Sequence, residues 1–229
     1  NGFYLPFKQD YTVEGFSAVT YKGSGGAQYI GGTGFQPNLV WLKNRTDTKY
    51  HLVLDSIRGT SGFLTSNDTM AEATEAHILS LDLDGFTVDD IDTGTSNESG
   101  DNYVAWCWDM GGSNASLTAG SINSTVRANP TYGQSIVSYT ANGTAGATVA
   151  HGLSSAPEMI IAKRRNSAED WGVGHTSLGW TKFIRLNTTG AEATATSLWN
   201  DTAPSNTLVT LGDSGIANNS SSTTMIMYC

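Results

Sequence analysis

The chain has 229 residues and a formal net charge of −9, with 12 Lys and Arg against 21 Asp and Glu. This balance excludes a nucleic-acid-binding footprint, because phosphate contacts need clustered Lys and Arg. No apolar run approaches the roughly 20 residues of a membrane-spanning helix, so no membrane insertion is expected. Only 14% of the residues are charged, and the abundance of Gly, Ser, Thr and Asn is typical of an all-β protein with many turns.

Residues 1–14 form an aromatic lead-in at the start of the chain. Its aromatic side chains Phe3, Tyr4 and Phe7 have no counterpart later in the sequence. Leaving such side chains in water is unfavourable, since burial of one phenylalanine stabilises a protein by about 1.5–3 kcal/mol. We therefore expect this segment to pack against an adjacent domain or a neighbouring subunit.

After the lead-in, the sequence repeats itself with an offset of 120 positions. Over residues 37–74, without a gap, twelve of thirty-eight residues are identical to those of residues 157–194. The match continues at both ends, with an offset of 118 at residues 17–21 and of 122 at residues 103–107. A repeated unit of roughly 95 residues has the size of a small domain rather than of a solenoid turn.

Each copy is predicted to contain six or seven short strands separated by turns. In the first copy the clearest are the alternating segments 16–21 and 51–55, the apolar segment 39–42 and the late segments 86–88 and 103–108. Their counterparts in the second copy are residues 135–139, 171–175, 159–162, 209–211 and 225–229. This pattern is typical of a small β-sandwich.

The sequence thus predicts two tandem β-sandwich domains related by internal duplication. The first occupies residues 15–110 and the second occupies residues 135–229, with a linker at residues 111–134. Relative to the first copy, the second ends early, directly at Cys229. We therefore expect the second sandwich to be truncated at its C-terminal end and the polypeptide to continue.

The two cysteines, Cys107 and Cys229, occupy equivalent places in the two copies. A disulfide between them would require two equivalent strand ends within about 6 Å at Cα. Two buried free thiols, each acting as a small apolar side chain at the end of a core strand, are the favoured interpretation.

The acidic segment 82–92 is the sharpest local candidate for a metal site. Its carboxylates could bind Ca²⁺ through oxygen ligands; they are Asp82, Asp84, Asp89, Asp90 and Asp92. The second copy has no such cluster, and the four histidines show neither ligand spacing nor matching positions in the repeat. Hydrolase motifs such as Gly-x-Ser-x-Gly are also missing. The sequence therefore predicts a non-enzymatic protein without catalytic residues, metal or cofactor.

Tryptophan side chains are the candidates for contact with a sugar, because an indole face suits the C–H patches of a pyranose ring. Trp41 and Trp106 lie in apolar strands and are expected in the core. The predicted glycan contacts are instead Trp171, Trp180 and Trp199, of which the first two are expected on an exposed face.

Five stretches of the chain resemble a family of tandem-repeat virion proteins from bacteriophages of marine and aquatic bacteria. They are NGFYLPFKQDYTVEGF (1–16), GFQPNLVW (34–41), WDMGGSNAS (108–116), HGLSSAPEMI (151–160) and WNDTAP (199–204). Members of that family are commonly labelled tail-fibre or structural proteins, and the resemblance covers almost the whole chain. It implies a β-rich domain within a longer polypeptide of an extracellular particle, and it supplies no catalytic residues.

The expected function is that of a bacteriophage virion structural protein in a tail fibre or surface appendage, contributing to assembly and host-surface attachment. Its expected partners are other copies of itself in a symmetric homo-oligomer, which is trimeric if it forms a fibre, other virion proteins and a host surface glycan. The alternative is a secreted carbohydrate-binding module or glycoprotein, since Asn-x-Ser/Thr occurs ten times. The same tripeptides also suit the turns of a β protein. A polysaccharide hydrolase is the third possibility.

Overall fold

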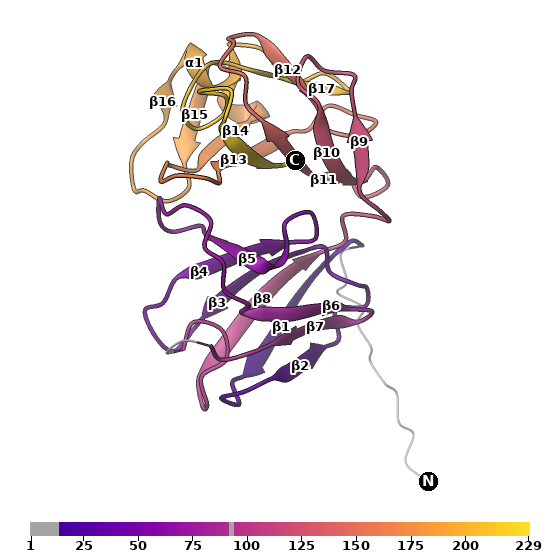
Figure 1. Cartoon of the computed structure of the whole chain (residues 1–229), viewed down its shortest axis with the longest axis vertical. Helices are drawn as coiled ribbons and strands as arrows, with labels where there is room; N and C mark the ends of the chain where they lie inside the picture. Colours follow the sequence, from indigo (N-terminus) through magenta and orange to yellow (C-terminus); the bar gives the residue numbers. More distant parts are fainter. Residues whose placement is uncertain (1–13, 92–93) are drawn as a thin grey trace.

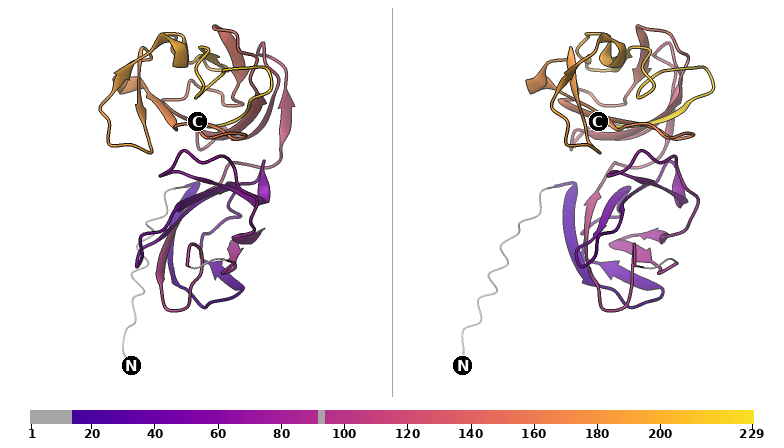
Figure 2. Two further views of the ribbon diagram at one scale, coloured as in Figure 1. Left: turned by 60° about the vertical axis from the view of Figure 1, so that its left-hand side comes forward. Right: turned by 90° about the vertical axis from the view of Figure 1, so that its left-hand side faces the viewer.

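The computed structural model describes residues 14–91 and 94–229. These residues form two lobes stacked along the long axis of the molecule (Figure 1). The N-terminal lobe comprises residues 14–91 and 94–110, and the C-terminal lobe comprises residues 111–229. Two further views show the same stacking from other sides (Figure 2). The prediction of an all-β protein is confirmed, because strands make up nearly all of the regular structure.

The N-terminal lobe is built from two antiparallel sheets. The large sheet has the strand order β1-β8-β3-β4-β5, and the small sheet has the order β2-β7-β6. The bounds of the strands are β1 (Phe16–Lys22), β2 (Gln28–Gly31), β3 (Leu39–Asn44), β4 (His51–Asp55), β5 (Gly59–Thr65), β6 (Ile78–Asp82), β7 (Gly85–Val88) and β8 (Asn102–Trp108). Buried side chains such as Ile30, Val40 and Phe86 fill the space between the two sheets.

The C-terminal lobe has a large sheet with the order β16-β15-β14-β13-β18-β11-β10-β9 and a small sheet made of β12 and β17. Its elements are β9 (Ala115–Leu117), β10 (Ser124–Asn129), β11 (Gln134–Thr140), β12 (Ala147–Ala150), β13 (Met159–Arg164), β14 (Gly172–His175), a 3-10 turn (Thr176–Leu178), β15 (Lys182–Arg185), β16 (Ala193–Thr194), α1 (Thr196–Trp199), β17 (Leu208–Leu211) and β18 (Thr224–Tyr228). No helix of the described residues is long and apolar enough to cross a membrane.

The central strands of the two large sheets have the same order and the same pairing. The run β1-β8-β3-β4-β5 of the N-terminal lobe corresponds to β11-β18-β13-β14-β15 of the C-terminal lobe. Trp41 is paired with Trp106, and at the positions shifted by 120 and 122 residues Ile161 is paired with Tyr228. A slip of one residue would turn every side chain to the opposite face, so equivalent residues of the two lobes face equivalent sides.

The segment 111–134, predicted as a linker, contributes two strands to the C-terminal lobe instead. Strand β10 pairs with β11, and β9 pairs with β10, so that both extend the large sheet at one edge. The reason is the alternation along β10, in which Ser124 and Val126 are buried while Thr125 is exposed. Such a pattern is that of a half-buried strand.

Both faces of the central strands are buried. In β3, Val40 and Leu42 belong to the core of the N-terminal lobe, whereas Leu39 belongs to a third apolar cluster between the lobes. In β18, the alternate residues Ile226 and Tyr228 belong to that same cluster. The large sheets therefore pack against one another. Each uses the face that points away from the core of its own lobe, and the contact includes the strand ends at Leu39 and Tyr228.

Candidate functional site at the lobe interface

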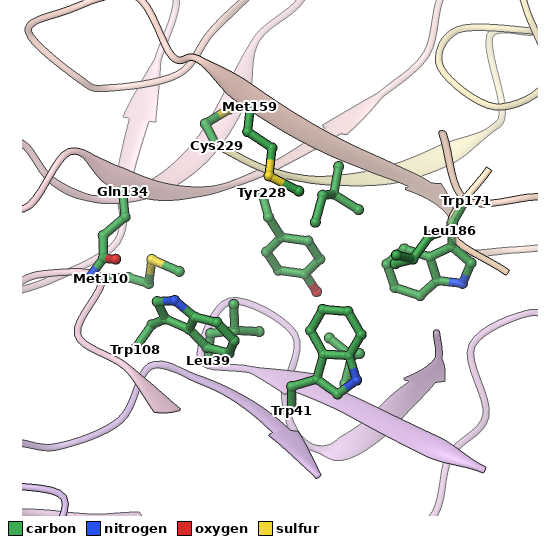
Figure 3. A pocket seen from close by; sticks show the side chains of 12 residues that line it. Leu39, Trp41, Trp108, Met110, Gln134, Met159, Trp171, Leu186, Tyr228 and Cys229 are labelled. Carbon is green, nitrogen blue, oxygen red and sulfur yellow. The ribbon is translucent and has the colours of Figure 1, made fainter. Parts of the chain in front are cut away.

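An open, mainly apolar pocket of about 270 Å³ lies between the two large sheets (Figure 3). Leu39 and Trp41 approach from below in that view, and Met159 and Tyr228 approach from above. Met159 is 44% exposed, which places it at the mouth. The pocket is lined by Leu39, Trp41, Val53, Trp108, Met110, Gln134, Met159, Ile161, Trp171, Leu186, Tyr228 and Cys229.

The polar groups around this pocket are few and mostly occupied. The side-chain amide of Gln134 donates to the carbonyl oxygens of Gly15 at 2.8 Å and Asp109 at 2.7 Å. Burial raises the pKa of Cys229 to about 12, so its sulfur is a neutral thiol and a poor nucleophile at neutral pH. The indole N–H of Trp41 is buried and has no acceptor among the residues that the structure describes. The pocket therefore suits an apolar group that carries one hydrogen-bond acceptor.

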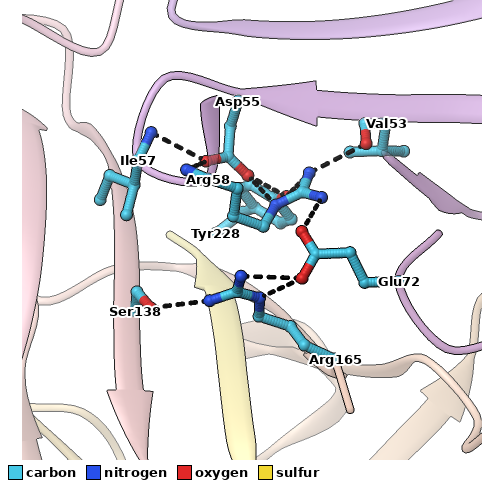
Figure 4. Close-up of polar contacts among 8 residues, drawn as sticks. All are labelled: Val53, Asp55, Ile57, Arg58, Glu72, Ser138, Arg165 and Tyr228. Carbon is cyan, nitrogen blue, oxygen red and sulfur yellow. Dashed lines mark hydrogen bonds and ion pairs between the residues drawn. The ribbon is translucent and has the colours of Figure 1, made fainter. Parts of the chain in front are cut away.

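A buried network of charges lies beside the pocket and centres on Arg58 (Figure 4). Its guanidinium group contacts Asp55 at 2.6 Å and Glu72 at 3.1 Å, and both Arg58 and Asp55 have fully buried side chains. From the C-terminal lobe, the hydroxyl of Tyr228 donates to Asp55 at 2.8 Å, and Arg165 contacts Glu72 at 2.7 Å. The network thus joins one residue of β18 and one residue directly after β13 to three residues of the N-terminal lobe.

Two groups of the network, Arg58 and Tyr228, stay protonated near neutral pH. Burial alone would disfavour the charged guanidinium, but the Asp55 carboxylate and, to a smaller extent, Tyr228 and Glu72 raise the pKa of Arg58 above its ordinary value. Burial also raises the pKa of Tyr228 well above its ordinary value, so this hydroxyl stays protonated. Neither Arg58 nor Tyr228 is therefore ready to release a proton at neutral pH.

A second set of contacts attaches residues 65–72 of the N-terminal lobe to the C-terminal lobe. The ammonium group of Lys163 donates to the carbonyl oxygens of Thr69 at 3.0 Å and Glu169 at 2.8 Å. The indole N–H of Trp171 donates to the carbonyl oxygen of Thr65 at 2.8 Å. Burial lowers the pKa of Lys163 to about 8, opposed by the charge of Glu169, which leaves it mostly protonated at neutral pH.

The expectation that Trp171 and Trp180 lie on an exposed face is wrong. Trp171 is 1% exposed in the interlobe cluster, while Trp180 at 8% and Trp199 at 1% pack edge to face in the core of the C-terminal lobe. Their ring faces are covered by protein, which leaves no stacking platform for a sugar. Conversely Trp41 and Trp106, expected in the core, are only partly buried on the outer face of β3 and β8.

Three described carboxylates of the acidic segment 82–92 accept hydrogen bonds, whereas the Oδ1 atom of Asp90 is buried without a partner among the described residues. Asp84 accepts hydrogen bonds from the backbone N–H groups of Gly32 and Gly34, and Asp82 accepts one from the hydroxyl of Thr87. Asp92 lies outside the described residues. A different group of carboxylates comes together in space, with oxygens within 4.8 Å of one another, and comprises Asp47, Glu98 and Asp101. Distant positions in the sequence supply it, so no local motif predicts it.

The sequence gives only an indirect signal for the charge network. Asp55 corresponds to His175 in the second copy, and Arg58 corresponds to Leu178. At both positions the two copies differ in charge. A residue that only fills the core common to both copies would not need to differ in this way, so such positions are candidates for another role. The partner Glu72 is the same in both copies, as Glu192, but Glu192 pairs with the exposed Lys182 instead.

Fold and site together define an all-β protein of two lobes that meet through an apolar cluster, an open pocket and a buried charge network. A family model described as "Domain of unknown function (DUF7483)" matches residues 12–229, and the chain therefore belongs to that family. One family model thus spans both lobes. No curated protein and no solved structure matches the chain.

Proposed function

We propose that this protein is a non-enzymatic structural component of a bacteriophage virion, located in a tail fibre or surface appendage. The observation that carries the proposal is the lobe interface, where an apolar cluster is combined with the buried hydrogen bond from Tyr228 to Asp55 and the ion pair of Arg165 with Glu72. Separating the lobes would expose the apolar cluster and deprive the buried Asp55 carboxylate of a hydrogen bond, and leaving a buried charged group less well paired is destabilising. Two lobes joined in this way form a stiff body, which suits an appendage that transmits force to a host surface.

The proposal includes an internal duplication that produced two tandem β-sandwich domains. The shared strand order of the large sheets supports it, as does the pairing of Trp41 with Trp106 and of Ile161 with Tyr228. In this proposal, residues 15–110 form the first sandwich. Residues 135–229 form the second, and the strands from residues 111–134 extend it at one edge.

The proposed partners are further copies of the chain, other virion proteins and a host surface glycan. Small domains gain buried area from contact between subunits. A symmetric homo-oligomer therefore suits the appendage, and a trimer suits a fibre. With Trp171, Trp180 and Trp199 buried, a glycan would have to bind other side chains of the surface.

Locating the protein in particles tests this function. Purified phage particles that encode the chain are labelled with a gold-conjugated antibody, with antibody pre-adsorbed on the purified protein as the control. Label concentrated on a tail appendage, together with the intact chain in the mass spectrum of the particles, is the expected result. A monomer recovered only outside particles, with glycans on its Asn-x-Ser/Thr sites, would overturn the proposal in favour of a secreted glycoprotein or carbohydrate-binding module.

A further inference from the structure

The lobe interface joins two different surfaces, and both exist on each lobe. The surface that the N-terminal lobe contributes, which we call the edge patch, includes Leu39, Leu64 and Glu72. The surface that the C-terminal lobe contributes, which we call the face patch, includes Lys163, Arg165, Ile226 and Tyr228. Because the central strands of the two lobes share their order and pairing, the N-terminal lobe also has a face patch and the C-terminal lobe also has an edge patch.

Charged groups hold the two patches together within the chain. Glu72 contacts Arg165 at 2.7 Å (Figure 4), and the backbone N–H of Glu72 donates to the carbonyl oxygen of Arg165 at 2.8 Å. Lys163 donates to the carbonyl oxygen of Thr69, three residues before Glu72, at 3.0 Å. The face patch thus binds a short segment that brings a carboxylate to its arginine and a carbonyl oxygen to its lysine.

The cations of the face patch recur in the N-terminal lobe, where solvent reaches them. Lys43 and Arg45 have the places of Lys163 and Arg165 at an offset of 120. Lys163 is fully buried, whereas Lys43 is partly exposed and Arg45 is exposed. Lys43 donates to the carbonyl oxygen of Asp47 at 3.0 Å within its own lobe. An ammonium group has three donors, so this bond leaves donors for a further acceptor.

The apolar part of the face patch shows the same contrast between the lobes. Val104 and Trp106 of β8 have the places of Ile226 and Tyr228 at an offset of 122. Ile226 and Tyr228 are buried in the interlobe cluster. Val104 and Trp106 are only partly buried. The N-terminal lobe therefore exposes apolar side chains at the positions that are covered in the C-terminal lobe.

The edge patch of the C-terminal lobe is exposed in turn. Met159 and Ile184 have the places of Leu39 and Leu64 at an offset of 120. Leu39 and Leu64 are buried in the interlobe cluster, whereas Met159 is 44% and Ile184 is 36% exposed. Removing such side chains from water is favourable, in proportion to the apolar area that a partner covers.

The acidic segment of this second edge patch matches that of the first. Thr189 and Glu192 have the places of Thr69 and Glu72, and both are exposed. Glu192 forms an ion pair with Lys182, in which the two side chains are 44% and 39% exposed. An exposed pair of this kind contributes little to stability, so Glu192 can exchange Lys182 for another cation at low cost.

From these observations we infer that the edge patch of the C-terminal lobe binds the face patch of the N-terminal lobe in a second copy of the chain. Glu192 then contacts Arg45, and the carbonyl oxygen of Thr189 accepts a hydrogen bond from Lys43. These contacts repeat those that join the two lobes within one chain. The inference names the surfaces through which the proposed partnership with further copies is made, and it rests on that part of the proposed function.

A contact of this kind is heterologous, because it joins two different surfaces. Copies therefore add head to tail, and they form a closed ring, such as the proposed trimer, or a filament. The places of Asp55 and Tyr228 are taken by His175 and Trp106 in the contact between copies. The bond from tyrosine to a buried carboxylate is not repeated there, so we expect this contact to be weaker than that between the lobes and to depend on concentration.

Charge reversal in the full chain provides the first test, with sedimentation velocity over a series of concentrations. The unmodified chain is expected to associate as its concentration rises. Arg45→Glu and Glu192→Arg each bring like charges together and should weaken association at least about tenfold. An equimolar mixture of the two variants should restore it, because opposite charges then meet at every contact. Asp213→Arg reverses an exposed charge outside both patches and is the control.

The apolar part of the contact provides the second test. Met159→Glu combined with Ile184→Glu should abolish association, whereas Leu83→Glu, at a side chain that is 87% exposed elsewhere on the chain, should not change it. Circular dichroism confirms that each variant is folded.

Three results overturn the inference: a monomer at every concentration, a mixture of the charge variants that stays monomeric, or association that these substitutions leave unchanged. Weakening by Arg45→Glu but not by Glu192→Arg also overturns it and assigns the face patch to pairing with itself. None of these results changes the location of the protein in particles, which the antibody labelling tests separately.

Discussion

At the level of single residues, the hydroxyl of Tyr228 is the most consequential polar group of the lobe interface. It donates to Asp55 at 2.8 Å and receives a contact from Arg58 at 3.3 Å, so one residue near the end of the chain completes a charge pair of the other lobe. The repeat places Trp106 at the corresponding position of the N-terminal lobe. Only the second copy therefore has a hydroxyl there.

Replacing Tyr228 by phenylalanine is expected to lower the free energy of unfolding by about 1.5–3 kcal/mol, because a hydrogen bond to a charged group is lost inside the protein. The control is Tyr139→Phe, which removes a hydroxyl that donates to the neutral carbonyl oxygen of Ala217 at 2.7 Å. About 1 kcal/mol is expected for that control. Urea unfolding of both variants measures the difference, and an equal or smaller loss for Tyr228→Phe would contradict the role of the network.

The thiol of Cys107 makes the stability depend on pH in the alkaline range. Burial raises its pKa from 9.0 to about 12 in the folded chain. Below pH 9 the thiol is protonated in both states and contributes no pH dependence. Between pH 9 and 12 the unfolded chain releases the proton first, so stability falls by about 1.4 kcal/mol per pH unit.

The variant Cys107→Ala isolates this effect, since the other buried titratable groups are unchanged. Between pH 8 and pH 10.5 the unmodified chain is expected to lose about 2 kcal/mol more unfolding free energy than the variant. Chemical denaturation at a series of pH values measures both curves. Curves that run parallel would show that the folded-state pKa of Cys107 is not raised.

At the level of elements, β4 and β14 show how the two lobes fill the same position differently. Val40 pairs with Leu54 in the N-terminal lobe, and Ile160 pairs with Gly174 at the equivalent place. A Cβ atom on Gly174 would lie 2.6 Å from the ring of Trp180 and 2.8 Å from the indole nitrogen of Trp199. The two indole rings therefore occupy the space that a side chain at this position would need.

Adding one methyl group at Gly174 tests whether the two indole rings fill the space of the missing side chain. Gly174→Ala is expected to destabilise the protein by about 1–3 kcal/mol, because overpacking forces the two indole rings to move. Gly26→Ala is the control, as no atom of the described residues other than its two chain neighbours lies within 4 Å of its added Cβ. That control should leave the stability unchanged or raise it by up to about 1 kcal/mol. Thermal unfolding followed by circular dichroism compares them, and equal midpoints would contradict the packing argument.

At the level of the whole molecule, the interlobe contacts make the lobes dependent on one another. The apolar cluster takes side chains from both lobes, and the indole N–H of Trp171 donates across the interface to Thr65. Separating the lobes would expose the cluster and remove the contacts that Tyr228 and Arg165 make to Asp55 and Glu72. We therefore expect the chain to unfold in one cooperative transition.

Trp171→Ala is expected to cost about 3–5 kcal/mol and to separate this transition into two, one for each lobe. Trp180→Ala removes an indole of similar size from the C-terminal core alone, where it packs on Trp199. This control should lower the midpoint but preserve a single transition. Differential scanning calorimetry distinguishes the two outcomes, and two transitions in the unmodified chain would contradict the coupling.

The sequence by itself determined what depends on local pattern. Alternation along residues 16–21 and 51–55 indicated strands, and β1 and β4 are found there. The all-β class followed from such segments because alternation with period two is readable within a few residues. The position of the two cysteines near the ends of strands was also predictable in this way, and both are free thiols.

The tertiary structure decided those features that depend on which other part of the chain packs against a strand. A strand such as β3 shows its apolar residues in the sequence, but whether Trp41 faces a core, a pocket or water depends on the lobe that packs against it. The same applies to Trp171, which is buried by residues about a hundred positions away, and to β10, which forms only because β11 offers an edge. Pairing with β11 and contact with the other lobe are long-range, so only the folded chain determines them.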